Sequence, residues 1–200
     1  MGRVAKIALG ASAFTGISAT GTLFAASATT TASEHSIESR EERDGSRSQI
    51  DHRFRIDPTR QLLDAHNRER VRLNLPKLKW NRHLQREAEE WGRELSRRGR
   101  LEHASKRLRN GTGENLWMGE AGIWDVDTMV NLFIDEKKHY RHGNFPDISR
   151  TGRWSDVAHY TQVIWRDTQE VGCAVVTERG WDVLVCRYWP AGNVWGRRAY

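Results

Sequence analysis

Glu136 is the residue whose placement points most directly to chemistry. Between Met129 and Tyr140 the large apolar residues recur at three- and four-residue steps, and Glu136 falls in the same series. The spacing predicts a helix that begins at Asp125 or Asp127 and carries Glu136 on its buried face. A buried carboxylate is costly unless it is paired or opens onto a polar cleft. We therefore expect Glu136 to face a partner in a cleft.

Serine and histidine residues raise the question of hydrolase chemistry. Ser155 and Asp156 lie close to His159, and Ser105 follows His103 by two residues. Catalytic triads are defined by geometry rather than by such spacings, and Ser155 is well explained as a helix cap. The zinc-protease motif His-Glu-x-x-His is absent from the sequence. We therefore expect no enzymatic activity, with a metal-dependent hydrolase or protease as the alternative.

The two cysteines lie in segments with the composition of β-strands. Residues 171–177 and 182–188 flank Arg179-Gly180, a two-residue turn that would place Cys173 opposite Cys186 at a non-hydrogen-bonded pair. Side chains approach closely there, so a disulfide is geometrically reasonable and would match an oxidising compartment. Two free buried thiols are the alternative.

Helices must position these residues. Pro58 is expected to open a first helix that has ended by Pro76, and Asn81 and Gly99 should bound a second one. A fourth, short helix is expected to start at Ser155, after the helix that carries Glu136.

The order of elements suggests how these helices are arranged. The segment 163–165, Trp117 and the hairpin 171–188 could form one sheet with helices on both of its faces.

Composition separates the chain into parts. All nine tryptophans lie between Trp80 and Trp195, so the core-forming region is the C-terminal two thirds. The net charge of +6 would allow contact with anionic surfaces, but no nucleic-acid-binding motif accompanies it and we expect no nucleic-acid partner. The mean hydropathy of −0.74, without a long uninterrupted apolar run, predicts no transmembrane segment.

The N-terminal region reads as a leader and an arm. Residues 1–28 contain a short basic start, a small apolar stretch and Ala26-Ser27-Ala28, the pattern of a secretory signal peptide cleaved after Ala28. Residues 29–57 contain few large hydrophobic residues, which predicts a disordered arm or pro-segment. The folded domain is then expected over residues 58–200.

Four motifs in the domain occur in a recognisable order: Gly-Glu-Asn-Leu at 113–116, His-Tyr-Thr-Gln-Val-Ile-Trp at 159–165, Val-Gly-Cys-Ala at 171–174 and Cys-Arg-Tyr-Trp-Pro-Ala-Gly-Asn at 186–193. Together they resemble the CAP superfamily of cysteine-rich secretory proteins, antigen 5 and pathogenesis-related 1 proteins, and most of all its secreted pathogenesis-related 1-like members. The resemblance implies an α+β fold, a three-layer α-β-α sandwich with a central antiparallel sheet.

The resemblance also implies a cleft with four polar residues, which correspond by motif to His103, Glu114, Glu136 and His159. Two imidazoles and two carboxylates can bind a divalent cation such as Zn²⁺ or Mg²⁺, with His103 and His159 as the ligands. They can equally form a hydrogen-bonded network that orients the helices. Both interpretations stay open, and no cofactor is required by either.

Lipid binding is the function that the resemblance favours. Several secreted members bind sterols or fatty acids, and the apolar residues around a glycine-rich stretch are candidates for such a groove: Trp117, Met118, Ile123 and Trp124. We therefore expect a monomeric, extracellular protein that binds a sterol or fatty acid in a defence or host–microbe setting. Asn110 begins a glycosylation sequon.

The C-terminal segment 190–200 supports a further alternative. It is similar to a peptide that plant pathogenesis-related 1 proteins release as a defence signal, which would require an extracellular receptor. This end of the chain departs from the plant pattern at Arg187, Trp189 and Ala199.

Overall fold

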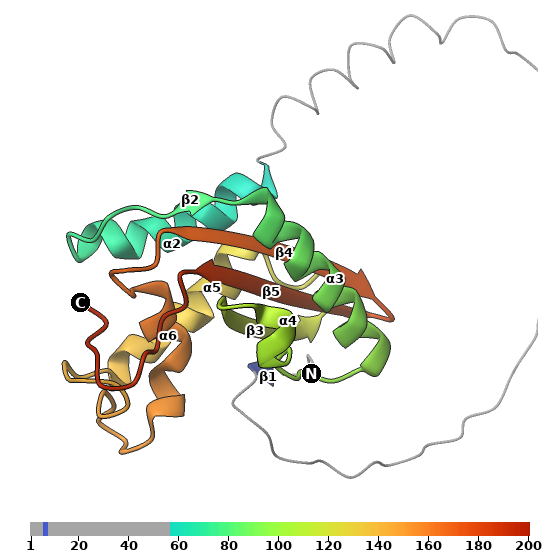
Figure 1. The fold of residues 1–200 in the computed structure, drawn as a ribbon. Helices are drawn as coiled ribbons and strands as arrows, with labels where there is room; N and C mark the ends of the chain where they lie inside the picture. Colours follow the sequence, from blue (N-terminus) through green and yellow to red (C-terminus); the bar gives the residue numbers. More distant parts are fainter. Residues whose placement is uncertain (1–5, 8–56) are drawn as a thin grey trace, which may run out of the picture. The chain divides into compact units, whose positions relative to one another are not determined.

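The structure is a computed structural model that describes residues 6–7 and 57–200 (Figure 1). The helices are α2 (Pro58–Arg72), α3 (Arg82–Arg98), α4 (Lys106–Arg109), α5 (Val126–Ile134) and α6 (Ala158–Val163), with 3₁₀ helices η1 (Asp135–His139) and η2 (Trp154–Val157). The strands are β1 (Lys6–Ile7), β2 (Lys79–Trp80), β3 (Gly113–Glu120), β4 (Glu170–Glu178) and β5 (Trp181–Trp189).

The strands form one sheet in the order β1-β3-β5-β4-β2. The pairs β1–β3, β3–β5 and β4–β5 are antiparallel, whereas β2 runs parallel to β4. The predicted central antiparallel sheet is therefore confirmed, and β2 adds a parallel strand at its edge. The two residues of β2 are held by backbone bonds from Lys79 N to Gln169 O and from Asn81 N to Val171 O, both 2.9 Å. A strand this short carries no period-2 pattern that could have revealed it.

Successive side chains along each strand point to opposite faces of the sheet, and this produces two hydrophobic layers. Leu116, Met118 and Val183 pack under α3 with Ala88 and Leu95. The side chains that point to the other face of the sheet belong to the larger core, which α2, α5 and α6 cover. They include Trp117, Cys173, Leu184, Cys186 and Tyr188. Figure 1 shows α3 lying across β4 and β5. The expected α-β-α sandwich is confirmed.

Local sequence signals predicted the ends of several helices and strands correctly. The Asn81 side chain accepts hydrogen bonds from the backbone N–H groups of His83 and Leu84, which caps α3, and Gly99 ends it with a φ of 64°. In the hairpin, Glu178 pairs with Trp181 and Cys173 with Cys186. The predicted disulfide between Cys173 and Cys186 is confirmed.

Two predicted elements differ from the structure. The helix expected to carry Glu136 ends at Ile134, and Glu136 lies in the 3₁₀ helix η1 instead, where the tighter winding turns its carboxylate toward α6. The segment 163–165, expected as strand, is the end of α6 and the turn after it. Apolar runs this short cannot distinguish a buried strand from a buried helix.

The predicted cleavage point after Ala28 and the arm over residues 29–57 lie almost wholly outside the described residues. Within the predicted leader, Lys6–Ile7 pairs with Met118 and Trp117 of β3. Among the described residues, no helix is long and apolar enough to cross a membrane.

Candidate functional site

His103 and Glu114 form the first polar pair of the site. His103 lies in the loop after α3, and Glu114 is the second residue of β3. The Nδ1–H of His103 donates to Glu114 Oε1 at 2.6 Å, and the backbone N–H of Ala104 donates to the same oxygen at 3.0 Å. The Glu114 side chain has no exposed surface, whereas the His103 side chain is 37% exposed. The carboxylate therefore holds the ring at the edge of solvent.

Arg187 lies beneath this pair. Its Nη2 lies 3.1 Å from Glu114 Oε2, and both side chains are buried. This contact is an ion pair rather than an aligned hydrogen bond, since Oε2 has no hydrogen-bond donor. Burial lowers the pKa of Arg187, and the Glu114 carboxylate acts against that shift. A buried carboxylate is costly without a counter-ion, and Arg187 supplies one to Glu114 beneath His103.

His159 and Glu136 form the second pair. The Nδ1–H of His159 donates to Glu136 Oε1 at 2.6 Å, and the backbone N–H groups of His159 and Tyr160 donate to Oε2 at 3.0 and 3.1 Å. The ring of Phe133 stacks on the imidazole with a centroid distance of 5.1 Å. Three donors and one stacked ring fix the orientation of His159 at the start of α6.

Both imidazoles line one cleft, which we call the central cleft, with a volume of about 470 Å³. Glu114 also lines it, whereas Glu136 lies behind His159 and does not. The structure thus brings the four predicted residues together as two His–Glu pairs. Each carboxylate accepts the hydrogen bond from Nδ1–H. Among the described residues, neither Nε2 atom has a hydrogen-bond partner.

This arrangement fits a cation held by two imidazoles. Histidine ligands of metals usually donate their second ring N–H to a carboxylate, as both rings do here. No group of three or more His, Cys, Asp or Glu ligand atoms gathers within 4.8 Å in the cleft, within the part of the chain that the structure describes. Among the described residues the one such cluster is His66 with Cys173 and Cys186, whose sulfurs are already joined in the disulfide. Glu114 and Glu136 thus act as partners of the histidines.

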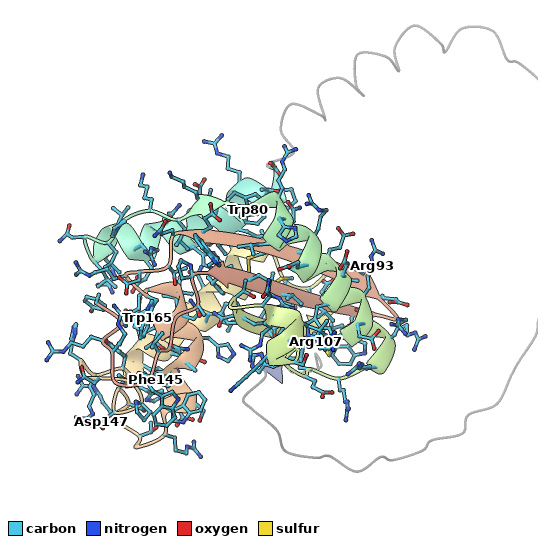
Figure 2. The ribbon with its side chains drawn as sticks, viewed as in Figure 1. Trp80, Arg93, Arg107, Phe145, Asp147 and Trp165 are labelled. Atoms are coloured by element: carbon cyan, nitrogen blue, oxygen red, sulfur yellow. A yellow bond between two sulfur atoms is a disulfide. The ribbon has the colours of Figure 1, made fainter. Side chains whose placement is uncertain are left out.

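Part of the lining of the central cleft, which we call the aromatic wall, is aromatic. Phe145, Trp154 and Trp195 form it. The Phe145 ring is buried and lies 5.3 Å from the Trp154 ring and 5.7 Å from the Trp195 ring, centroid to centroid. Trp154 and Trp195 remain 44% and 69% exposed. Figure 2 shows Phe145 near Asp147, in the loop between η1 and η2.

Sequence reasoning missed this aromatic wall. Phe145 and Trp195 come from separate loops and Trp154 from the start of η2, and no periodic spacing links them. Their aromatic identity was the one available signal.

The model of the cysteine-rich secretory protein family, CAP, matches residues 63–188. This chain belongs to the CAP family. Pathogenesis-related protein 1B of Nicotiana tabacum is 33% identical over 139 residues, which cover 69% of this chain and 78% of that protein. Venom allergen 5 of Vespa mandarinia is 32% identical over 134 residues, 62% of this chain and 61% of that protein.

Solved structures share the CAP fold. The crystal structure of NaASP2 with Zn²⁺ matches with a TM-score of 0.62 at 21% identity, over 72% of this chain and 86% of that one. The structure of BmVAL-1 gives the same TM-score and identity, over 73% and 84%.

The four residues predicted to contact lipid lie elsewhere in this CAP domain. Trp117 and Met118 are buried on opposite faces of β3, and the Trp124 ring packs edge-on against Trp117 at 5.8 Å. Ile123 is 66% exposed. None of the four lines the central cleft. Trp117 and Met118 serve as core because β3 is covered on both faces.

The C-terminal segment 190–200 is built into the domain. The carbonyls of Arg197 and Ala199 accept hydrogen bonds from the N–H groups of Phe145 and Arg166, at 2.8 and 2.7 Å. The Ala199 side chain is buried, and the Asn193 side chain accepts a hydrogen bond from the Thr161 hydroxyl. Release of a peptide from this segment would therefore remove part of the core and of the cleft wall. Asn110, which begins the sequon, is exposed at the end of α4.

Proposed function

We propose that this CAP protein acts outside the cell as a non-enzymatic binding protein for a sterol or another amphipathic lipid. The observation that carries the proposal is the chemistry of the central cleft, which is lined both by imidazole and charged groups and by the aromatic residues Phe145, Trp154 and Trp195. Its volume of about 470 Å³ lies in the range of small-molecule sites. The apolar body of the ligand would lie on the aromatic wall, and its polar end would face the histidines.

The bonding of the histidines supports binding rather than catalysis. A serine hydrolase needs its imidazole hydrogen-bonded to the nucleophile. Ser155 lines the cleft, yet among the described residues no serine hydroxyl is bonded to His103 or His159. A metal-dependent hydrolase is the alternative, and turnover that disappears with His159→Gln would favour it.

The setting we propose rests on the relatives. These relatives include pathogenesis-related proteins of plants and venom allergens of wasps. Together with the signal-like N-terminus, they support secretion and a role in defence or in contact between organisms.

Sterol binding can be tested on the purified protein with labelled cholesterol. We expect saturable binding, and we expect Trp195→Ala to weaken it about tenfold, because a large aromatic contact contributes roughly 1 to 1.5 kcal/mol. Trp189→Ala is the matched control, since Trp189 is 46% exposed but does not line the cleft. Absence of saturable binding by folded protein, or equal losses in both variants, would contradict the proposal.

A divalent cation at His103 and His159 is a second candidate, favoured by the two Nε2 atoms that have no partner among the described residues. A bound cation would supply a positive charge at the polar end of the ligand. We expect calorimetry with Zn²⁺ to show weak, single-site binding. His103→Gln should reduce the affinity about tenfold or more, whereas His83→Gln, at an exposed histidine on α3, should not. Unchanged binding in His103→Gln would exclude this site.

A further inference from the structure

We propose that the polar end of the bound ligand is anionic, and that Lys106 and Arg109 of α4 bind it. The inference rests on the proposed lipid-binding function and specifies its ligand class. It predicts that an amphiphile with a sulfate, phosphate or carboxylate group binds better than the same apolar body with a neutral hydroxyl.

The two cations lie on the wall of the central cleft and have unused donors. Lys106 and Arg109 both line the cleft, beside His103. Arg109 Nε–H donates to the carbonyl of Ala104 at 2.9 Å, which fixes the guanidinium while leaving its two η nitrogens available. Among the described residues, neither cation has a carboxylate within ion-pair distance, whereas the α3 arginines Arg93 and Arg98 have one. The positive charge of α4 at the cleft is therefore not compensated locally.

The other charged residues that line the cleft do not neutralise Lys106 and Arg109. Glu114 is the one carboxylate among the described lining residues, and it is already compensated by Arg187 at 3.1 Å and by the bond from His103. Glu136 lies behind His159, where three N–H groups bind it. The net charge at the cleft wall is therefore positive, which favours an anion.

The amides of the lining are already occupied. The Gln162 side chain accepts from the N–H of Gly192 and donates to the Thr168 hydroxyl. The Asn193 side chain accepts from the Thr161 hydroxyl and donates to the Ala158 carbonyl. Beside the Nε2 atoms of the two histidines and the Ser155 hydroxyl, the groups left for a ligand are therefore the charged N–H donors of Lys106 and Arg109. Such a set matches an acceptor-rich anion better than a single hydroxyl group.

The aromatic wall requires that the anion be attached to an apolar body. Trp154 and Trp195 expose large ring surfaces in the same cleft. A free inorganic anion would leave both rings in water, whereas an anionic amphiphile would cover the rings and place its charge at α4. This argument selects a lipid with an anionic headgroup over a free phosphate or sulfate ion.

The test compares three probes on the full chain: cholesteryl sulfate, cholesterol and inorganic sulfate. We expect cholesteryl sulfate to bind about tenfold or more tightly than cholesterol at low salt, and the preference to shrink as salt is added. Inorganic sulfate at the same concentration should not compete. Equal affinity for the two sterols would overturn the inference while leaving the proposed function intact. Binding of neither sterol would contradict both, and effective competition by sulfate alone would show a simple anion site.

Charge variants on α4 locate the site. We expect Lys106→Glu, and separately Arg109→Gln, to reduce the preference for the sulfate ester over cholesterol at least about threefold. Arg107→Ala is the matched control, since Arg107 belongs to the same short helix, labelled in Figure 2, but does not line the cleft. Lys106 makes no side-chain hydrogen bond to a described residue, so its variant should fold normally. An equal effect of Arg107→Ala would show a general charge effect and overturn the assignment.

Discussion

Replacing Arg70 with methionine should remove about 3 to 5 kcal/mol of the free energy of unfolding, a large share of the stability of a domain of this size. Arg70 is fully buried and has no carboxylate partner within ion-pair distance among the described residues. Instead, its five N–H groups donate to five backbone carbonyls, those of Pro76, Val163, Trp165, Arg166 and Thr168. Methionine would fill similar space but would remove all five donors. The Trp165 carbonyl would keep its bond from the Thr168 N–H, and the other four carbonyls would lose the donor that Arg70 provides.

Arg70 connects α2 with the turns on either side of Arg166, which the sequence places more than ninety residues away. Burial lowers its pKa to about 10, so the guanidinium remains charged at neutral pH. Arg70→Lys should destabilise less than Arg70→Met, because an ammonium group can still donate three of the five bonds.

Urea denaturation followed by tryptophan fluorescence would measure these losses. Arg68→Ala is the matched control on the same helix, since Arg68 is an exposed arginine paired with Asp127 and should change stability by less than about 1 kcal/mol. If Arg70→Met unfolds within about 1 kcal/mol of the parent protein, the carbonyl network is not the stabilising feature we take it to be.

A second large effect should appear on acidification, from His66. Burial lowers the pKa of His66 from 6.5 to about 4. Its Nδ1–H donates to the Leu62 carbonyl at 2.7 Å, so the neutral ring accepts at Nε2 from the Tyr188 hydroxyl at 2.8 Å. That hydroxyl in turn accepts from the Asn115 side chain at 3.2 Å. Protonation would place two donors face to face between His66 and Tyr188.

The direction of the pH effect follows from proton binding. Below pH 6.5 the unfolded chain protonates His66, whereas the folded protein resists protonation until about pH 4. The stabilisation is therefore complete above pH 6.5 and is lost as the pH falls toward 4, by about 3 kcal/mol in total. Burial alone would raise the pKa of Glu69, but the hydrogen bonds from Arg72 and Tyr160 outweigh it, so this pKa lies below its usual value. The stabilisation that Glu69 provides is therefore lost only below about pH 4.5.

Unfolding free energies measured between pH 7 and pH 4.5 would test this prediction. His66→Gln keeps a neutral hydrogen-bonding side chain and should flatten the slope in this window. His83→Gln, at an exposed position, should retain the slope of the parent protein. A steep loss of stability that persists in His66→Gln would assign it to other groups.

Local sequence signals determined the secondary structure where short-range chemistry decides it. Asn81 and Gly99 mark the ends of α3 because a side-chain cap and a left-handed residue act within one turn of the helix. The pairing of Cys173 with Cys186 followed from a two-residue turn, since the turn fixes the register of the whole hairpin. The family, and through it the four cleft residues, followed from motifs that are continuous in the sequence.

Tertiary structure decided how those residues act. Only the folded chain shows that Arg187 compensates Glu114, or that Glu136 lies on a 3₁₀ turn behind His159. It also shows that Phe145, Trp154 and Trp195 line the cleft, whereas Trp117 and Met118 belong to the two hydrophobic layers. Sequence spacing reports contacts within a helix or a hairpin, whereas a cleft is lined by residues from distant segments. Whether such residues lie close together depends on how the helices and the sheet pack, and no local sequence pattern predicts that packing.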